Sequence, residues 1–298
     1  MATPALIRAA LPGESELQSF ARAAAHLLVE RQPRSGGSRA VARRAGIGLQ
    51  HFDHRDYAPG DEVRHIDWRH TARSRRPIVR RFELESVTDW TLVLDASSSM
   101  TVDGAAKWRS AVQAAAALAY ALLHLGHRVG MLAFGFRVLA ECARGRGQHH
   151  YATIARQLTT LRPSPAGERS ELGACAPRLH GDGSVVVIGD FLGDDEMRHD
   201  LGRLLQRCTA LHVLQVGDAA ETRLRLAGEF DLVDVETGAR LPVRAGGQVD
   251  ALATLERAAM TGRLRGFCAR SGVAFTAWDI ALPWQHMLLR HLIQARGN

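Results

Sequence analysis

The sequence predicts an α/β fold in which a mostly parallel sheet carries helices on both faces. From residue 91 onward, short runs of strand-type residues alternate with longer stretches of helical character. Several of these runs, such as residues 185–188, are apolar throughout. This pattern is typical of strands that are buried on both faces of a parallel sheet.

The N-terminal part is predicted to be a helix followed by an irregular arm. Apolar side chains recur at helical spacing over residues 13–32, and Pro33 with the Ser-Gly run after it ends the pattern. Residues 46–85 are dense in Arg, His and Asp, and strand-like residues return at 77–84. Because so short a stretch cannot bury a core alone, we divide the chain into an N-terminal helix and arm, residues 1–85, and an α/β domain, residues 86–298.

Within the α/β domain, the predicted elements follow one another in a regular alternation. Helices are expected at residues 105–125, 151–161, 170–179, 194–207, 249–271 and 284–296. Strands are expected at residues 91–94, 129–134, 184–189, 210–216 and 273–278, with an antiparallel partner at 137–141 and a hairpin at 229–243.

Composition limits the possible partners and the compartment of the protein, but it does not identify one partner. The net charge of +7 fits a nucleic acid, an anionic lipid or an acidic protein as partner, and equally a solvated basic surface. The four cysteines lie far apart and form no Cys-x-x-Cys pair, so we expect a reducing, cytoplasmic compartment and no zinc site. There is no secretory leader pattern, and the longest apolar run, residues 114–125, is too short to span a bilayer.

Asp95, Ser97 and Ser99 follow the first predicted strand in an Asp-x-Ser-x-Ser pattern. A loop of this kind presents a carboxylate and two hydroxyls to a hard divalent cation, and Mg²⁺ prefers such oxygen ligands. Open α/β sheets also place their ligand sites at the carboxyl ends of strands. The purely structural alternative is that the two serines cap the helix that follows.

Two later loops offer similar groups. Ser170 precedes a predicted helix, and Asp190 directly follows the apolar strand at 185–188. If the three loops converge, two carboxylates and three hydroxyls surround one cation. Such a site leaves the cation net electrophilic, so we expect its open position to accept an acidic ligand, such as an Asp or Glu of a partner.

The order Asp95-x-Ser97-x-Ser99, Ser170, Asp190 resembles the metal-ion-dependent adhesion site of von Willebrand factor A domains, over roughly residues 87–298. The resemblance implies that Ser97 and Ser99 ligate the metal, Mg²⁺ or otherwise Mn²⁺ or Ca²⁺, and that the two aspartates hold it largely through water. Ser170 stands where that family has threonine. Serine keeps the hydroxyl group of threonine and lacks its methyl group. The residue after Asp190 is phenylalanine, where many of these domains have glycine.

A second motif lies upstream, where residues 55–73 read Arg-x-Tyr-x-Pro-Gly-Asp-x-x-Arg-x-Ile-Asp-Trp-x-x-x-Ala-Arg. We interpret it as a turn followed by a charge-paired segment, in which Asp61 and Asp67 pair with Arg64 and Arg73, and Ile66 and Trp68 are apolar anchors. Acidic residues lie among the arginines, and no repeated aromatic platform is present. Internal ion pairing is therefore favoured over nucleic-acid binding.

This string is similar to the hallmark of the bacterial family called domain of unknown function 58, in which it precedes a von Willebrand A-like domain. The later stretch Asp-Val-Glu-Thr-Gly, residues 234–238, continues the match. The resemblance implies a MoxR-type AAA+ ATPase as partner, and a role in chaperone-like assembly or metal-site maturation. The chain has no Walker loop, so ATP hydrolysis would be supplied by the partner.

Taken together, these features predict a non-enzymatic, divalent-metal-dependent protein-interaction module, with Asp95, Ser97, Ser99, Ser170 and Asp190 as metal ligands and no catalytic residue. One alternative is a basic nucleic-acid-binding protein. Another is a metal-dependent hydrolase that uses the same cluster, although the sequence places no His or Glu as a general base and has no nucleophile elbow.

Overall fold

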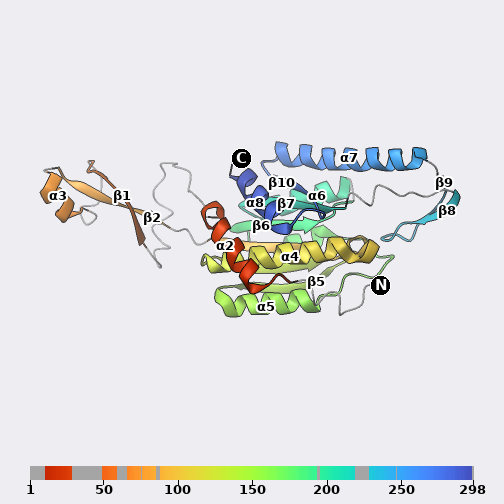
Figure 1. Ribbon diagram of the computed structural model, residues 1–298, viewed down its shortest axis with the longest axis horizontal. Helices are drawn as coiled ribbons and strands as arrows, with labels where there is room; N and C mark the ends of the chain where they lie inside the picture. Colours follow the sequence, from red (N-terminus) through yellow and green to blue (C-terminus); the bar gives the residue numbers. More distant parts are fainter. Residues whose placement is uncertain are drawn as a thin grey trace. The chain divides into compact units, whose positions relative to one another are not determined.

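The computed structural model describes residues 11–28, 49–58, 66–74, 76–84, 88–192, 195–218, 228–245 and 247–296. These residues form two compact units (Figure 1). One unit combines the N-terminal helix α2 (Glu14–Leu28) with the chain from Thr88 onward, and the other lies within residues 29–87.

A six-stranded sheet forms the centre of the larger unit. Its strands, in spatial order, are β10 (Ala274–Asp279), β7 (Ala210–Gly217), β6 (Gly183–Gly189), β3 (Asp89–Asp95), β4 (Arg128–Phe134) and β5 (Val138–Gly145). Every neighbouring pair is parallel except β4 and β5, which are antiparallel. The predicted α/β class, with a mostly parallel sheet and an antiparallel edge partner, is confirmed.

Helices cover both faces of this sheet. The helical elements of the larger unit after α2 are η3 (Ser98–Thr101), α4 (Val102–His124), α5 (Gly147–Thr160), η4 (Leu172–Arg178), α6 (Asp195–Leu205), α7 (Gly247–Arg270) and α8 (Trp284–Ala295). Alternate side chains of β3 lie on opposite faces of the sheet and belong to two different hydrophobic cores. Leu92 and Leu94 pack with α2, α4, α5 and α8, whereas Val93 packs with η4, α6 and α7. The period of two explains why the central strands are apolar throughout.

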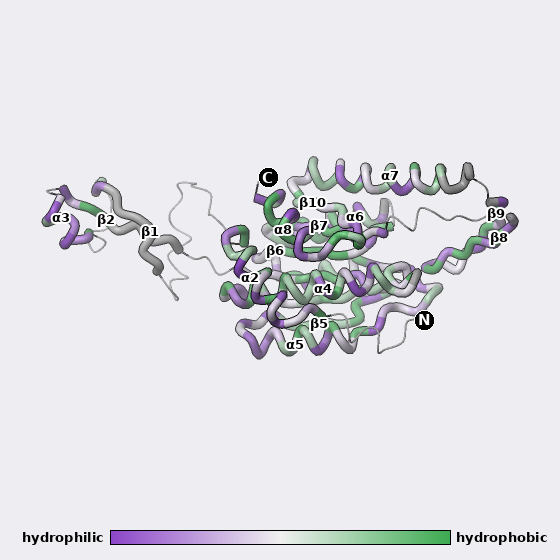
Figure 2. Tube along the Cα trace, in the orientation of Figure 1, coloured by the Kyte–Doolittle hydropathy of each residue, from purple (hydrophilic) through white to green (hydrophobic). Residues whose placement is uncertain are grey.

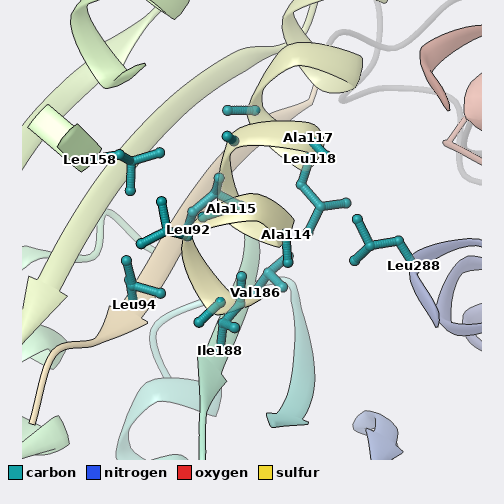
Figure 3. Close-up of a cluster of buried hydrophobic side chains, with 14 of the residues drawn as sticks. Leu92, Leu94, Ala114, Ala115, Ala117, Leu118, Leu158, Val186, Ile188 and Leu288 are labelled. Atoms are coloured by element: carbon teal, nitrogen blue, oxygen red, sulfur yellow. The ribbon is translucent and has the colours of Figure 1, made fainter. Parts of the chain in front are cut away.

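Helix α4 crosses the middle of the sheet at close range because its inner face is built from alanine. Ala114 and Ala115 are fully buried, and Figure 3 shows them beside Leu92 of β3 and Val186 of β6. A small side chain at the contact lets the helix backbone approach the strands. The alanine-rich run is thus a buried helix, as the sequence indicated.

Helix α2 belongs to the sheet unit, which differs from the predicted division at residue 85. Its apolar stripe, including Leu17 and Phe20, is buried in the same core as α4. The Phe20 ring meets the Trp284 ring of α8 edge to face, with 5.3 Å between centroids. An amphipathic helix buries its apolar stripe wherever a matching surface exists, and here that surface is provided by helices far along the chain.

The smaller unit contains an antiparallel strand pair where the sequence suggested an irregular arm. Strand β1 (Leu49–Asp56) pairs with β2 (Ile78–Leu84), and α3 (Trp68–Ser74) lies between them in sequence. Asp67 caps α3, because its Oδ1 accepts the backbone N–H groups of Arg69 and His70.

Trp68 is 65% exposed, so it is not the apolar anchor that was predicted. Figure 2 shows the hydrophilic character of α3, and Asp61 and Arg64 lie outside the described residues.

Strands β8 (Gly228–Val233) and β9 (Arg240–Ala245) form the predicted antiparallel hairpin, with the turn at residues 234–239. The four cysteines are free thiols, and three of them are buried. Among the described helices, none combines the length and the apolar character that a bilayer crossing needs.

The buried pair His212 and His291 predicts that the free energy of unfolding decreases at acidic pH. His291 is 1% exposed, and its ring nitrogens contact His212 Nδ1 at 3.1 Å and Thr276 Oγ1 at 2.9 Å. Burial lowers the pKa of His212 to about 4 and that of His291 to about 3, from an ordinary value of 6.5. Both rings are therefore neutral in the folded protein, while the unfolded chain takes up protons below pH 6.5.

Stability should accordingly be complete above pH 6.5 and decrease as the pH falls toward 4. Between pH 6.5 and pH 5, we expect the free energy of unfolding to drop by about 2 kcal/mol per histidine. Urea unfolding measured across this range checks the prediction. The double variant His212→Gln, His291→Gln should flatten the dependence, whereas the exposed His199→Gln should not, and equal slopes for both variants would contradict it.

Candidate functional site

The sheet brings the predicted residues to one end of the molecule. Asp95 is the last residue of β3, and Asp190 directly follows β6. Because β3 and β6 are parallel neighbours, with Leu94 opposite Ile188, the two carboxylates emerge at the same edge. Asp95, Asp190 and Ser170, which precedes η4, line one cavity of about 320 Å³. The structure thus brings Asp95, Ser170 and Asp190 together at this cavity, and Ser99 is linked to the cavity by its hydrogen bond to Glu236.

Asp95 is buried at the base of this site and held by its own loop. Its Oδ1 accepts the backbone N–H of Ser97 at 2.9 Å. Gly189 of β6 is essential to the packing, since a Cβ there would lie 2.8 Å from Oδ2 of Asp95. Burial, and then the nearby charge of Asp190, raise the pKa of Asp95 to about 8, against the opposing effect of the hydrogen bonds from Ser97.

The two serines of the first loop turn their hydroxyls toward each other and not toward a helix end. Ser97 Oγ lies 2.9 Å from Ser99 Oγ. Neither the 3₁₀ turn η3 nor helix α4 has a side-chain cap hydrogen bond, so the capping alternative does not describe these residues. Ser170 Oγ is buried and has no hydrogen-bond partner among the described residues. Buried hydroxyls normally have a partner, so this one is available for a hydrogen bond or for coordination.

Asp190 is paired with a residue that the sequence reasoning missed. Lys107 of α4 donates to Asp190 Oδ2 at 2.8 Å, and both side chains are almost completely buried. Lys107 is the only lysine in a chain whose Lys and Arg total 38. That it is the only lysine is the one feature of the sequence that could have pointed to this residue. Phe191, the next residue after Asp190, adopts a left-handed φ of 52°, a backbone region that favours glycine.

A second missed residue is Glu236, in the turn between β8 and β9. Its Oε1 accepts the hydroxyl of Ser99 at 3.1 Å, and its Oε2 accepts the backbone N–H of Ser170 at 3.4 Å. Glu236 lines the same cavity as Asp95 and Asp190. Burial raises its pKa, and the hydrogen bonds from Ser170 and Ser99 oppose that rise. The acidic stretch at 234–238 was visible in the sequence, but not its contact with the serine loop.

The donor set fits a hard divalent cation. The predicted ligands, together with Glu236, offer only hydroxyl and carboxylate oxygens, which Mg²⁺ and Ca²⁺ prefer, although Arg169, Leu192 and Met197 also line the cavity. Within the described residues, no group of three or more His, Cys, Asp or Glu side chains is placed to hold a metal. Any cation here would therefore be contacted by serine hydroxyls, with some of the carboxylates holding it through water and not by direct contact.

Comparison with known proteins identifies the family. The sequence model of a family described as "Protein of unknown function DUF58" matches residues 53–260. The chain belongs to the DUF58 family. Similar proteins include the uncharacterized proteins Rv1480 of Mycobacterium tuberculosis and Mb1516 of Mycobacterium bovis, each 32% identical over 199 residues. These matches cover 65% of this DUF58 chain and only 62% of each relative's length.

Two solved structures are similar to this chain at a low level. BatB from Bacteroides thetaiotaomicron is 12% identical, covers 71% of this chain and 100% of its own, and has a TM-score of 0.43. An aerotolerance-related membrane protein from Bacteroides fragilis is 13% identical, covers 70% of this chain and 99% of its own, with the same TM-score. Likenesses at this level carry no inference about function.

The Lys107–Asp190 pair yields a stability prediction for this DUF58 protein. Replacing Lys107 with Met leaves a buried carboxylate without its ammonium partner, and we expect a loss of about 3–5 kcal/mol in the free energy of unfolding. The matched control is Arg244→Met, whose ion pair with Glu229 is highly exposed and should change stability by less than about 1 kcal/mol. Urea unfolding of both variants tests this prediction. Similar small losses in the free energy of unfolding of the two variants would contradict it.

Proposed function

We propose that this DUF58 protein is a non-enzymatic interaction module that binds an acidic side chain of a partner protein through a divalent cation. The cation, Mg²⁺ or a related hard ion, would be held by Asp95, Ser97, Ser99, Ser170 and Asp190. The observation that carries the proposal is the buried Ser170 hydroxyl, which has no partner among the described residues and lines a cavity shared with Asp95, Asp190 and further carboxylates.

Each residue has a distinct part in the proposed site. The Ser97 and Ser99 hydroxyls are already close together and supply two neutral oxygens, and Ser170 supplies a third. Asp95 and Asp190 provide negative charge from the ends of adjacent strands. When bound, the cation would supply an electrophilic centre that a carboxylate can complete. The resemblance to the metal-ion-dependent adhesion site of von Willebrand A domains supports the same assignment.

The partner we propose is a MoxR-type AAA+ ATPase, or an acidic client presented with it, in chaperone-like assembly or maturation. The support is the family resemblance, together with the absence of a Walker loop from this sequence. Such a protein would contribute recognition, and the ATPase would contribute energy. Because the chain spans less than two thirds of its relatives' length, further parts of those proteins would add to this role.

Cation binding tests this function directly. Mn²⁺ titrated into the wild-type protein should bind at one site, as measured by electron paramagnetic resonance of the free ion. Asp95→Asn and Ser97→Ala should each weaken binding by about tenfold or more, because each removes a ligand or its support. The control is Ser184→Ala, a buried serine at the opposite end of β6, which should leave the affinity unchanged.

The same variants should lose Mg²⁺-dependent capture of the partner ATPase in a pull-down, with the circular dichroism spectrum retained. Capture that is equal in Mg²⁺ and in EDTA would refute the proposed function. Loss of binding in Ser184→Ala as well would show that the variants act through the fold and not through the site.

A further inference from the structure

The turn of the β8–β9 hairpin is rigidly built around Asp234. Its Oδ1 accepts the backbone N–H of Glu236 at 2.8 Å, and its Oδ2 accepts the hydroxyl of Thr237 at 2.8 Å. Gly238 closes the turn with a φ of 71° and a backbone hydrogen bond to Asp234. This geometry holds Glu236 at the tip of the hairpin in one orientation.

Two hydrogen bonds fix that tip to two loops of the candidate site. The carbonyl oxygen of Val235 accepts both the Ser98 hydroxyl at 3.1 Å and the Gly167 backbone N–H at 2.8 Å. Ser98 lies between the two serines of the first loop, and Gly167 belongs to the loop that carries Ser170. The hairpin therefore bridges the loops whose hydroxyls face the cavity.

The carboxylate of Glu236 continues the row of oxygens begun by the serines. Ser97 Oγ and Ser99 Oγ are 2.9 Å apart, and Ser99 Oγ and Glu236 Oε1 are 3.1 Å apart. Adjacent ligands of an octahedral Mg²⁺ with bonds of 2.0–2.1 Å are separated by about 2.9 Å. In this structure these separations are those of hydrogen bonds, and they are also compatible with neighbouring ligands of one ion.

Charge in the cavity favours the same assignment. Asp95, Asp190 and Glu236, when ionised, carry three negative charges, and the Lys107 ammonium carries one positive charge. A divalent cation then brings the group to formal neutrality. Without Glu236, the same group would carry one net positive charge and would attract an external carboxylate. Four more charged residues line the cavity. Arg169 pairs with Glu196 and Asp200 pairs with Arg203, whereas Glu171 adds a negative charge that this count leaves out.

We propose that Glu236 is an internal ligand that occupies the position meant for a partner's acidic side chain. The inference rests on the proposed function, since it concerns the same cation. In this arrangement the hairpin keeps the site closed, and a partner's Asp or Glu gains access only when the tip of the β8–β9 hairpin leaves the serine loops. The Glu236 carboxylate then competes with the partner's carboxylate for the cation, and a partner binds only if it displaces the hairpin.

The test compares Glu236→Gln with wild type by using Mn²⁺ and a capped Gly-Glu-Gly peptide as probes. Glu236→Gln should bind Mn²⁺ about tenfold more weakly, because it replaces a charged ligand by a neutral one. At saturating Mn²⁺, its complex should bind the peptide at least about tenfold more tightly than wild type does, since the internal competitor has gone. Water-proton relaxation should also show one more exchangeable water on Mn²⁺. The matched control is Glu229→Gln, an exposed carboxylate of the same hairpin.

The outcomes separate this inference from the proposed function. If wild type and Glu236→Gln bind Mn²⁺ and peptide equally well, the internal ligand is refuted while the cation site stands. If Asp95→Asn also binds Mn²⁺ as wild type does, the cation site itself is refuted, and the internal ligand with it.

Hydrogen exchange provides a readout that needs no variant. The Gly167 amide is protected by Val235 as long as the hairpin is docked. In wild type, Mn²⁺ alone should slow its exchange, and Mn²⁺ with an excess of peptide should accelerate it. Exchange that is unaffected by the peptide at concentrations that bind would refute displacement of the hairpin.

Discussion

The site depends on one constraint, the burial of two carboxylates side by side at the ends of β3 and β6. Asp95 and Asp190 are each only 2% exposed. Two like charges removed from water must be compensated by a partner charge, by hydrogen bonds or by a proton. The surroundings offer each of these. Lys107 faces Asp190, the Ser97 backbone N–H faces Asp95, and the pKa of Asp95 is raised.

The choice of lysine at position 107 follows from the same constraint. Every other strongly basic residue of the chain is arginine, so the exception calls for a local cause. A guanidinium presents five donors in a wide planar fork and needs several acceptors when it is buried, whereas an ammonium is a compact point charge. A cavity that must also leave room beside Asp190 favours the smaller group. The lysine thus balances one carboxylate and leaves the other oxygens facing the cavity.

Much of this arrangement could be predicted from the sequence because it depends on local patterns. The apolar runs gave the strands, and the order of parallel strands placed Asp95 and Asp190 at a common edge. Lys107 and Glu236 could not be placed in the same way, since each reaches the site through tertiary packing. Lys107 does so from α4, and Glu236 from a hairpin 137 residues beyond Ser99. The division at residue 85 differed from the structure for the same reason, because α2 is buried by α4 and α8, which lie far along the chain.

The hairpin contact links two properties that would otherwise be independent. If Glu236 contributes to cation binding, then docking of the hairpin strengthens the cation site and the cation strengthens docking, by the same factor in each direction. A partner carboxylate that replaces Glu236 keeps the cation but removes this support from the hairpin. Partner binding would therefore be coupled to release of the β8–β9 tip, with Val235 giving up its bonds to Ser98 and Gly167 together. The energy of those bonds opposes partner binding, so a weak carboxylate ligand leaves the site closed and only a partner with additional contacts opens it.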